Sequence, residues 1–205
     1  PPPSPPPRAP GAGVFNDTAL NAAVKEWAAD ASKAEAKHGH VSGWDTSRVT
    51  TMFQLLGGAA TFNGDISKWD TSQVTTMAKT FENAAAFNSE LAWDTSKVTT
   101  LSKTFWHAKT FNSELNWDTS KVTLMVYTFA DADVFNQRID NWDVARVVSF
   151  SNMFHYTSVS GFDACNRQLT YNSFSQQNPS FGHESWQSVT GCPPSAPPPT
   201  PPPSP

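Results

Sequence analysis

An aspartate directly follows a tryptophan five times along the chain, and in four cases a serine stands two residues further on. Repeated carboxylates suit calcium, but each ion needs six to eight oxygen ligands, and one Asp with one Ser per repeat supplies too few. The same pair is typical of an Asx turn, in which the carboxylate accepts a hydrogen bond from the N–H two residues ahead. We interpret the row as turn-forming, with a metal ladder as the alternative. The aspartates are Asp45, Asp70, Asp94, Asp118 and Asp143.

The remaining ionisable residues give little support for catalysis. His38 and His40 stand two residues apart, but no third metal ligand lies near them in the sequence, and solvated or capping roles fit them better. Glu90 and Glu114 occupy equivalent turns of neighbouring repeats, where we expect a solvated row rather than an acid/base pair. The sequence contains no G-x-S-x-G, P-loop or HExxH motif. We therefore expect a protein that is not an enzyme and holds no metal or cofactor.

The two cysteines favour a disulfide and an oxidising compartment. Cys165 and Cys192 are the only cysteines, and both follow the last repeat. A bridge between them would close a loop of about 28 residues and contribute on the order of 3–4 kcal/mol. Two unrelated buried thiols are the alternative. Asn16 begins the only N-glycosylation sequon, which agrees with secretion.

These residues belong to a sequence with a period of 24 or 25 residues. The repeated tryptophans lie at positions 44, 69, 93, 117 and 142, and four of the copies end in Phe-Asn. A fixed period of this length is typical of a solenoid, in which each repeat is one coil that cannot bury its apolar face alone. The copies begin WDTSRVTTM, WDTSQVTTM, WDTSKVTTL, WDTSKVTLM and WDVARVVSF.

Each coil should contain a short strand and a short helical segment. The Val-Thr-Thr-Met stretch is β-branched and short, which predicts a strand. Apolar residues then follow at steps of four, three and three, which predicts a short helix or 3₁₀ segment. The rows expected in the core are Val41, Ile66, Leu91, Leu115 and Ile139; Val49, Val74, Val98, Val122 and Val147; Met52, Met77, Leu101, Met125 and Phe150; Leu56, Phe81, Phe105, Phe129 and Phe154; Ala59, Ala84, Ala108 and Ala132; and Phe62, Phe87, Phe111 and Phe135.

The asparagines that close the repeats, and the two ends of the stack, have structural interpretations. An amide side chain after the last Phe can satisfy bare backbone groups of the return turn. These asparagines are Asn63, Asn88, Asn112 and Asn136. Residues 18–37 predict one amphipathic helix that lids the first coil, with Asp17 or Thr18 as N-cap and Gly39 as its stop. At the other end the segment that contains Phe162, Leu169, Tyr171, Phe174, Phe181 and Trp186 should close the last coil.

Composition sets the organisation of the whole chain of 205 residues. All but one of the 17 prolines, Pro179, lie in residues 1–10 and 193–205, which we expect to be polyproline II rods in a segment of a longer secreted polypeptide. The expected units are a spacer at 1–13, a helical cap at 14–43, the repeats at 44–160, a second cap at 161–192 and a spacer at 193–205. Candidates for proline hydroxylation and O-glycosylation are Pro2, Pro3, Ser4, Pro6, Pro7, Pro194, Pro198, Pro199, Pro202, Pro203 and Ser204.

The register resembles the BspA-like surface-protein repeats, relatives of leucine-rich repeats. The resemblance covers about residues 15–192 and depends on the repeated WDxSxVT and Phe-Asn, on the opening from Gly39 to Asp45, and on a closing segment around Ala164-Cys165-Asn166. The fifth copy departs from it, with Val144 and Ala145 in place of Thr and Ser and no Phe-Asn after them. The resemblance implies an α/β solenoid like that of leucine-rich repeats, with about five coils. It also implies an extracellular surface protein without catalytic residues.

Departures from the repeat suggest a contact surface. Trp106 stands where other copies have small or polar residues, and it follows a core Phe, so we expect it to face outward. Leu124, Val126 and Tyr127 make the fourth coil unusually apolar. Exposed aromatic and aliphatic residues mark an interface, and overpacking against a cap is the alternative.

Two classes of function remain open. A net charge of −4 gives no basic surface for nucleic acid, and no apolar run is long enough to span a membrane. The first class is a structural module of an extracellular wall, surface or filament glycoprotein, a bead between glycosylated polyproline rods that self-associates into fibres. The second is an adhesion module that binds carbohydrate or protein through one face. The proline-rich segments favour the first class.

Overall fold

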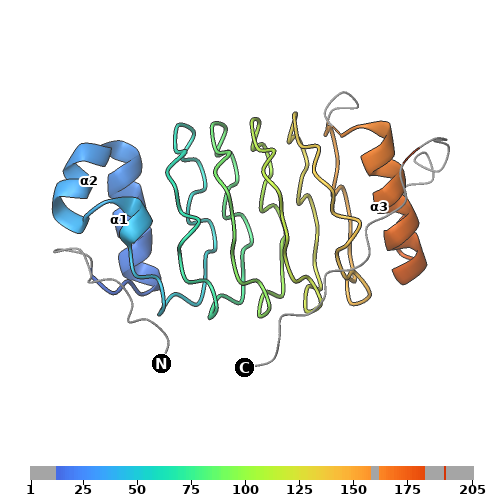
Figure 1. The fold of residues 1–205 in the computed structure, drawn as a ribbon, viewed down its shortest axis with the longest axis horizontal. Helices are drawn as coiled ribbons and strands as arrows, with labels where there is room; N and C mark the ends of the chain where they lie inside the picture. The colour runs from blue at the N-terminus through green and yellow to red at the C-terminus, as the bar shows by residue number, and fades with distance from the viewer. Residues whose placement is uncertain (1–12, 158–161, 183–191, 193–205) are drawn as a thin grey trace.

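The computed structural model describes residues 13–157 and 162–182 and Cys192. Three α-helices and a 3₁₀ turn lie at the two ends of a row of coils that runs through the middle of the molecule (Figure 1). Helix α1 spans Asp17–Ala29, α2 spans Ala31–His38 and the 3₁₀ turn η1 spans Val41–Gly43. Helix α3 spans Ala164–Gln177.

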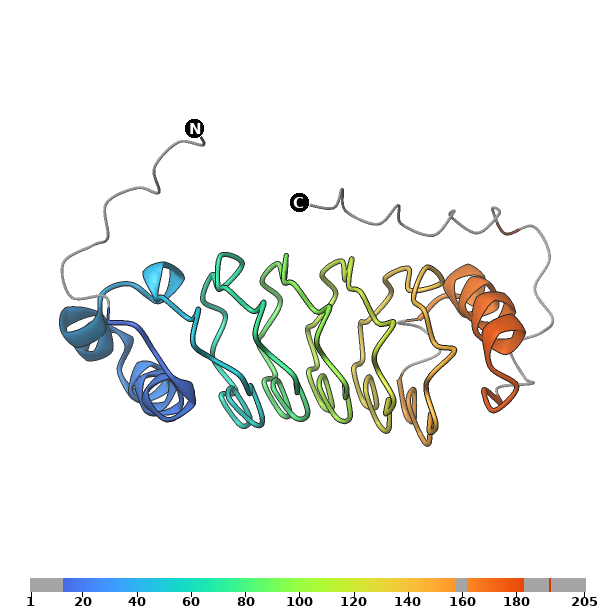
Figure 2. The same ribbon diagram turned by 90° about the horizontal axis from the view of Figure 1, so that it is seen from below.

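Between residues 44 and 157 the backbone winds in coils that lie side by side, which both views show (Figures 1 and 2). Backbone hydrogen bonds join residues one repeat apart in successive coils. The Thr75 N–H donates to the Thr50 carbonyl at 2.9 Å, and the Thr99 N–H donates to the Thr75 carbonyl at 2.9 Å. The sequence period is therefore the length of one coil.

The strand and the helix predicted in each coil do not form. In the described part of residues 44–157 the backbone makes only isolated parallel bridges, such as that between Thr51 and Thr76, and otherwise turns and irregular segments. In each coil the eight residues that begin at the Met, Leu or Phe after the bridge form a chain of overlapping turns, which we call the turn ribbon. The five ribbons cover residues 52–59, 77–84, 101–108, 125–132 and 150–157.

Alternating backbone handedness is the reason that the ribbon is not a helix. In the third ribbon the Thr104 N–H bonds the Leu101 carbonyl at 3.1 Å, and the Ala108 N–H bonds the Phe105 carbonyl at 3.1 Å. Lys103, between them, has a left-handed φ of 58°, which a right-handed helix of L-residues does not accept. The Lys103 N–H then points to the next coil, where it bonds the Val126 carbonyl at 2.8 Å. Turns of about three residues leave the apolar side chains at the spacing of a helix.

The predicted core rows are confirmed. Every residue of these rows is buried except Ala59, which is half-buried. Equivalent aromatic rings stack from coil to coil: the rings of Trp93 and Trp117 are 6.4 Å apart at an interplanar angle of 1°, and those of Phe105 and Phe129 are 5.5 Å apart at 3°. Offset stacking at these distances adds to the energy of burying each ring.

The N-terminal cap contains two helices instead of the one that was predicted over residues 18–37. The chain breaks at Asp30, whose extended backbone ends α1 and whose side chain caps α2 by accepting from the Lys33 N–H at 3.0 Å. Neither Asp17 nor Thr18 is the N-cap of α1; Asn16 is, and it accepts from the Ala19 N–H at 2.9 Å. Gly39 ends α2 with a left-handed φ of 76°, as predicted.

The C-terminal cap consists of α3 and the turn after it. Phe162, Leu169, Phe174 and Phe181 are buried as expected, and Tyr171 is half-buried against the core. Trp186 lies outside the described residues. In both views α3 lies beside the last coil, at the opposite end from α1 (Figures 1 and 2).

Candidate functional site

The repeated aspartates form the Asx turns that the sequence predicted. The carboxylate of Asp94 accepts a hydrogen bond from the Ser96 N–H at 2.9 Å, and Asp143 does the same for Ala145 at 3.0 Å although no serine stands there. The other three aspartates make the same bond. The Ser96 contacts lower the pKa of Asp94. Within the described residues no group of three His, Cys, Asp or Glu side chains is placed to hold a metal ion.

Two further ladders join the coils. Each asparagine after the last Phe accepts from the backbone of the next coil, as in the bond from the Asn112 N–H to Asn88 Oδ1 at 2.7 Å; Asn63 and Asn112 repeat it. Four of the five repeated tryptophans donate their indole N–H to a carbonyl one repeat back, as Trp93 does to Ile66 at 3.0 Å, and Trp44 of the first coil donates to the Gly39 carbonyl at 3.0 Å. The sequence analysis missed the indole ladder, although a buried indole N–H needs an acceptor and could have suggested it.

Threonine hydroxyls also bond from coil to coil, and the coils in which another residue replaces the threonine lie at the ends of the stack. The Thr119 hydroxyl donates to the Asp143 carbonyl in the next coil at 2.9 Å. The equivalent position in the last coil has no coil after it, and Val144 stands there, fully buried. In the ribbon the Thr80 hydroxyl donates back to the Met52 carbonyl at 3.0 Å, and the first coil, which has none before it, has Leu55 at that position. In these two cases the polar residue is replaced where its partner is missing, whereas Met153 lacks the hydroxyl in the last coil although a coil precedes it.

The first coil is closed by Asp17, a role that the sequence analysis did not foresee. Its carboxylate accepts from the Thr50 N–H at 2.7 Å, from the Thr50 hydroxyl at 2.8 Å and from the Thr51 N–H at 3.1 Å. In later coils the first two of these donors bond the threonine carbonyl of the preceding coil. Partial burial alone would raise the pKa of Asp17, but the bonds from Thr50 and Thr51 outweigh it and lower that pKa.

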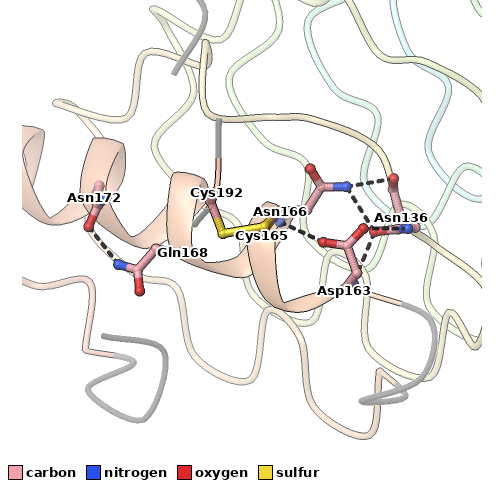
Figure 3. Close-up of a disulfide and its surroundings, with 7 residues drawn as sticks. All are labelled: Asn136, Asp163, Cys165, Asn166, Gln168, Asn172 and Cys192. Atoms are coloured by element: carbon pink, nitrogen blue, oxygen red, sulfur yellow. Dashed lines mark hydrogen bonds between the residues drawn. A yellow bond between two sulfur atoms is a disulfide. The ribbon is translucent and has the colours of Figure 1, made fainter. Parts of the chain in front are cut away.

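The predicted disulfide is confirmed and ties α3 to the end of the chain that the structure describes. Cys165 and Cys192 are bonded, with their Cα atoms 5.1 Å apart (Figure 3). Next to the bridge the asparagine ladder ends on α3. Asn136 Oδ1 accepts from the Asp163 N–H at 3.0 Å and from Asn166 Nδ2 at 2.8 Å. The backbone of Asp163 thus replaces the coil that would have followed.

The four predicted interface residues lie on the third and fourth coils. The structure brings Trp106 and Tyr127 together, with ring centres 5.9 Å apart, and both rings are half-buried. The ammonium of Lys103 lies over both rings, 4.0 Å from the centre of Trp106 and 5.6 Å from that of Tyr127. Leu124 is 37% exposed in a bridge to Thr100 and Ser149, and the half-buried Val126 follows two residues later.

The last ribbon borders a groove that the sequence analysis did not predict. It is lined by Val148, Phe150, Asn152 and Tyr156 of the last coil and by Ser180 and Gly182 after α3, and its volume is about 600 Å³. Val148 and Tyr156 are the most exposed large apolar side chains in the described part of the chain, at 72% and 74%. This groove and the adjoining ribbon are the candidate site.

The other predicted site residues have ordinary surroundings. His38 bonds Glu26 at 2.8 Å and His40 bonds the Ser42 hydroxyl at 2.7 Å, while Glu90 and Glu114 are exposed. Asn16 is exposed at the start of α1. The proline and serine modification candidates lie outside the described residues. None of the helices that the structure describes is both long and apolar enough to cross a bilayer.

Comparison with known proteins identifies a family. A family model described as "Mycoplasma protein of unknown function, DUF285" matches residues 23–116 and again residues 91–184. The chain belongs to this family. Two overlapping matches are expected of a DUF285 sequence whose coils repeat, because the model can be placed on them in more than one position. Neither the curated proteins nor the solved structures that were compared with the chain contain a match.

Proposed function

We propose that this protein is a non-enzymatic structural module of an extracellular surface, wall or filament glycoprotein. Its coils form a solenoid related to the BspA-like and leucine-rich repeats, and this solenoid is a bead between proline-rich rods. The module assembles with other copies or with the glycans and proteins of the surface.

The use of the repeated polar residues carries this proposal. All five Trp-Asp pairs, all four asparagines after Phe and the four threonines that follow Asp are engaged in turns or in bonds between coils. A repeat in which the polar side chains hold the backbone together builds a scaffold, and its outer face is free to vary. Binding and catalytic residues, in contrast, depend on polar groups that the fold leaves available.

Two properties of the chain support the extracellular assignment. The disulfide between Cys165 and Cys192 is of a kind that persists in oxidising compartments. The proline-rich segments at residues 1–10 and 193–205 contain Pro-Pro-Pro blocks beside serine or threonine, which are typical of hydroxyproline-rich glycoproteins. Sugars on such segments would stiffen them into spacers.

Mass spectrometry of the protein from its native source tests the structural role. We expect hydroxyproline and attached sugar at the proline and serine candidates of both segments, and an oxidised Cys165–Cys192 pair. Unmodified prolines together with reduced cysteines would contradict the extracellular rod-and-bead role.

An adhesion module that binds carbohydrate or protein is the second candidate. The cluster of Trp106, Tyr127 and Lys103 favours it, because aromatic rings and a cation on an outer face suit recognition of a partner. A glycan array with the purified chain separates the two functions. Binding that Trp106→Ser abolishes would favour the adhesion module, whereas no binding to any glycan leaves the structural module as the better account.

A further inference from the structure

The backbone hydrogen bonds between neighbouring ribbons all run in one direction, whereas the threonine hydroxyls of the ribbons donate the other way. The N–H groups of Gln54, Lys79, Lys103 and Tyr127 each donate to a carbonyl of the next coil, at 3.1, 3.0, 2.8 and 3.0 Å. The second row, four residues further on, behaves in the same way, from Gly58 to Asp131. The backbone of each ribbon therefore presents acceptors to the coil before it and donors to the coil after it.

In the last ribbon these donors meet no further coil. Asn152 and Tyr156 occupy two of the four backbone donor positions, and both have the left-handed φ, 55° and 54°, of their equivalents. Within the part of the chain that the structure describes, no acceptor is bonded to either N–H group. Both residues line the groove, and Tyr156 exposes most of its ring beside it. The ribbon edge thus offers backbone donors and an aromatic ring.

A proline-rich segment has the complementary chemistry. Proline has a carbonyl and no N–H, so a run of prolines supplies acceptors and leaves no donor to be satisfied. Its polyproline II conformation is already extended and loses little entropy on binding, and its rings pack on aromatic side chains. This chain carries such runs itself, as Pro-Pro-Pro at residues 1–3, 5–7, 197–199 and 201–203.

The position of the N-terminal segment makes it the better occupant for an assembly. The described chain begins beside the first coil, where Val14 pairs with Asp45, at the opposite end from the groove. Residues 1–13 cover at most roughly 40 Å as polyproline, and the four coil steps back to the groove take up about 19 Å of it, so only about half of the segment could lie in the groove of its own copy. The segment of another copy has no such restriction.

We propose that the groove of the last coil binds the proline-rich segment, residues 1–10, of a second copy. Each copy then carries a groove at one end of its stack and a ligand at the other. A contact between different surfaces does not close on itself, so copies join head to tail into a fibre. This inference rests on the proposed structural function and identifies the contact through which copies would assemble.

Titration of the full chain with a labelled peptide of residues 1–10 tests the proposal. At low protein concentration, NMR should show shifts confined to the amides of Asn152 and Tyr156 and their neighbours in the groove. Tyr156→Asn, which tolerates the left-handed backbone, should weaken binding by roughly five- to ten-fold because it removes the ring. The matched control is Phe53→Ser, which removes an exposed aromatic ring from the first ribbon and should leave the affinity unchanged.

Three results would overturn the proposal. The first is that the peptide does not bind at about 1 mM, the limit of a weak contact. The second is that the shifts map to the Trp106–Tyr127 cluster. The third is that a peptide of residues 193–205 binds the groove in place of residues 1–10. Binding of residues 193–205 would indicate that this segment fills the groove of its own copy, because Cys192, which directly precedes it, is bonded to α3 beside the last coil. Any of them leaves the structural function standing, since the chemistry of the proline-rich segments tests that separately.

Discussion

The two ends of the coil stack are closed differently. At the first coil, Asp17 takes the place of a preceding coil and accepts the bonds of Thr50 and Thr51. At the last coil, Asp163 ends the asparagine ladder, and Asn178 donates to the Val144 and Val147 carbonyls at 2.9 and 2.7 Å. The ribbon of the last coil is left without such a substitute at Asn152 and Tyr156.

This difference shows which part of the last coil is available for a partner. A buried backbone group without a partner costs free energy, so a stack that ends must supply substitutes for the missing coil. The chain supplies them wherever α1 and α3 cover the stack. The donor edge of the last ribbon has no such substitute, and it coincides with the groove and with the exposed ring of Tyr156. We therefore expect the interior coils to provide the stability, and we place the proposed assembly at this edge.

The largest expected effect is in the interior. Replacing Phe105 by Ala should lower the free energy of unfolding by about 3–5 kcal/mol, because it removes a fully buried ring that stacks on Phe81 and Phe129. Phe53→Ala, at a half-exposed position of the first ribbon, should change it by less than about 0.5 kcal/mol. Urea unfolding measures both, and equal midpoints for the two variants would show that the interior is not the stable part.

Opening the disulfide should affect one end alone. Cys165→Ser with Cys192→Ser should cost about 2–4 kcal/mol. In hydrogen exchange, α3 and the last coil should lose protection before the first coil does, because each coil contacts only its neighbours. Equal loss of protection at both ends would contradict the one-dimensional account of the stack.

Two opposite substitutions at the end of the threonine ladder, Thr119→Val and Val144→Thr, should each lower the free energy of unfolding. Thr119→Val removes the donor to the Asp143 carbonyl and should cost about 1 kcal/mol. Val144→Thr places a hydroxyl at a fully buried position where no next coil accepts it, and should cost about 1–3 kcal/mol. Thermal unfolding measures the stability of both variants relative to the parent. A Val144→Thr variant as stable as the parent would mean that the last coil provides an acceptor for the new hydroxyl.

The smallest expected effect on stability is that of the Asp17 carboxylate at the first coil, and it should depend on pH. Bonds from Thr50 and Thr51 lower the pKa of Asp17 in the folded state, so its contribution is present above about pH 4 and is lost as the pH falls through the folded value. Asp17→Asn should therefore be less stable than the parent at neutral pH, and the difference should shrink in acid. A difference that is independent of pH would show that the charge is not what closes the first coil.

The sequence predicted the core and the turns but not the local backbone. The period placed almost every core row correctly, because equivalent residues of stacked coils must share an environment. The Asx turns and the asparagine ladder followed from side-chain chemistry. The helix and strand were wrong, because overlapping turns repeat apolar residues at the same spacing as a helix and only the left-handed φ of residues such as Lys103 distinguishes them.

The candidate site was harder to predict than the core. Trp106 and Tyr127 were identified because they break the repeat, and the structure brings them into contact. The groove at the last coil depends on which N–H groups meet no partner, and that requires the direction of every bond between coils. Val144 and Leu55 were signals in the sequence, since each loses a hydroxyl at the end where the acceptor coil is missing.

Residue-resolved hydrogen exchange of the full chain at low concentration is the most direct test of the comparison. The amides of Gln54 and Asn152 occupy the same place in the first and last ribbons, and so do those of Gly58 and Tyr156. We predict that Gln54 and Gly58 exchange slowly, because their N–H groups bond the next coil, and that Asn152 and Tyr156 exchange at close to the rate of free amides. Equal protection of the two pairs would contradict the open edge and with it the assembly that we propose.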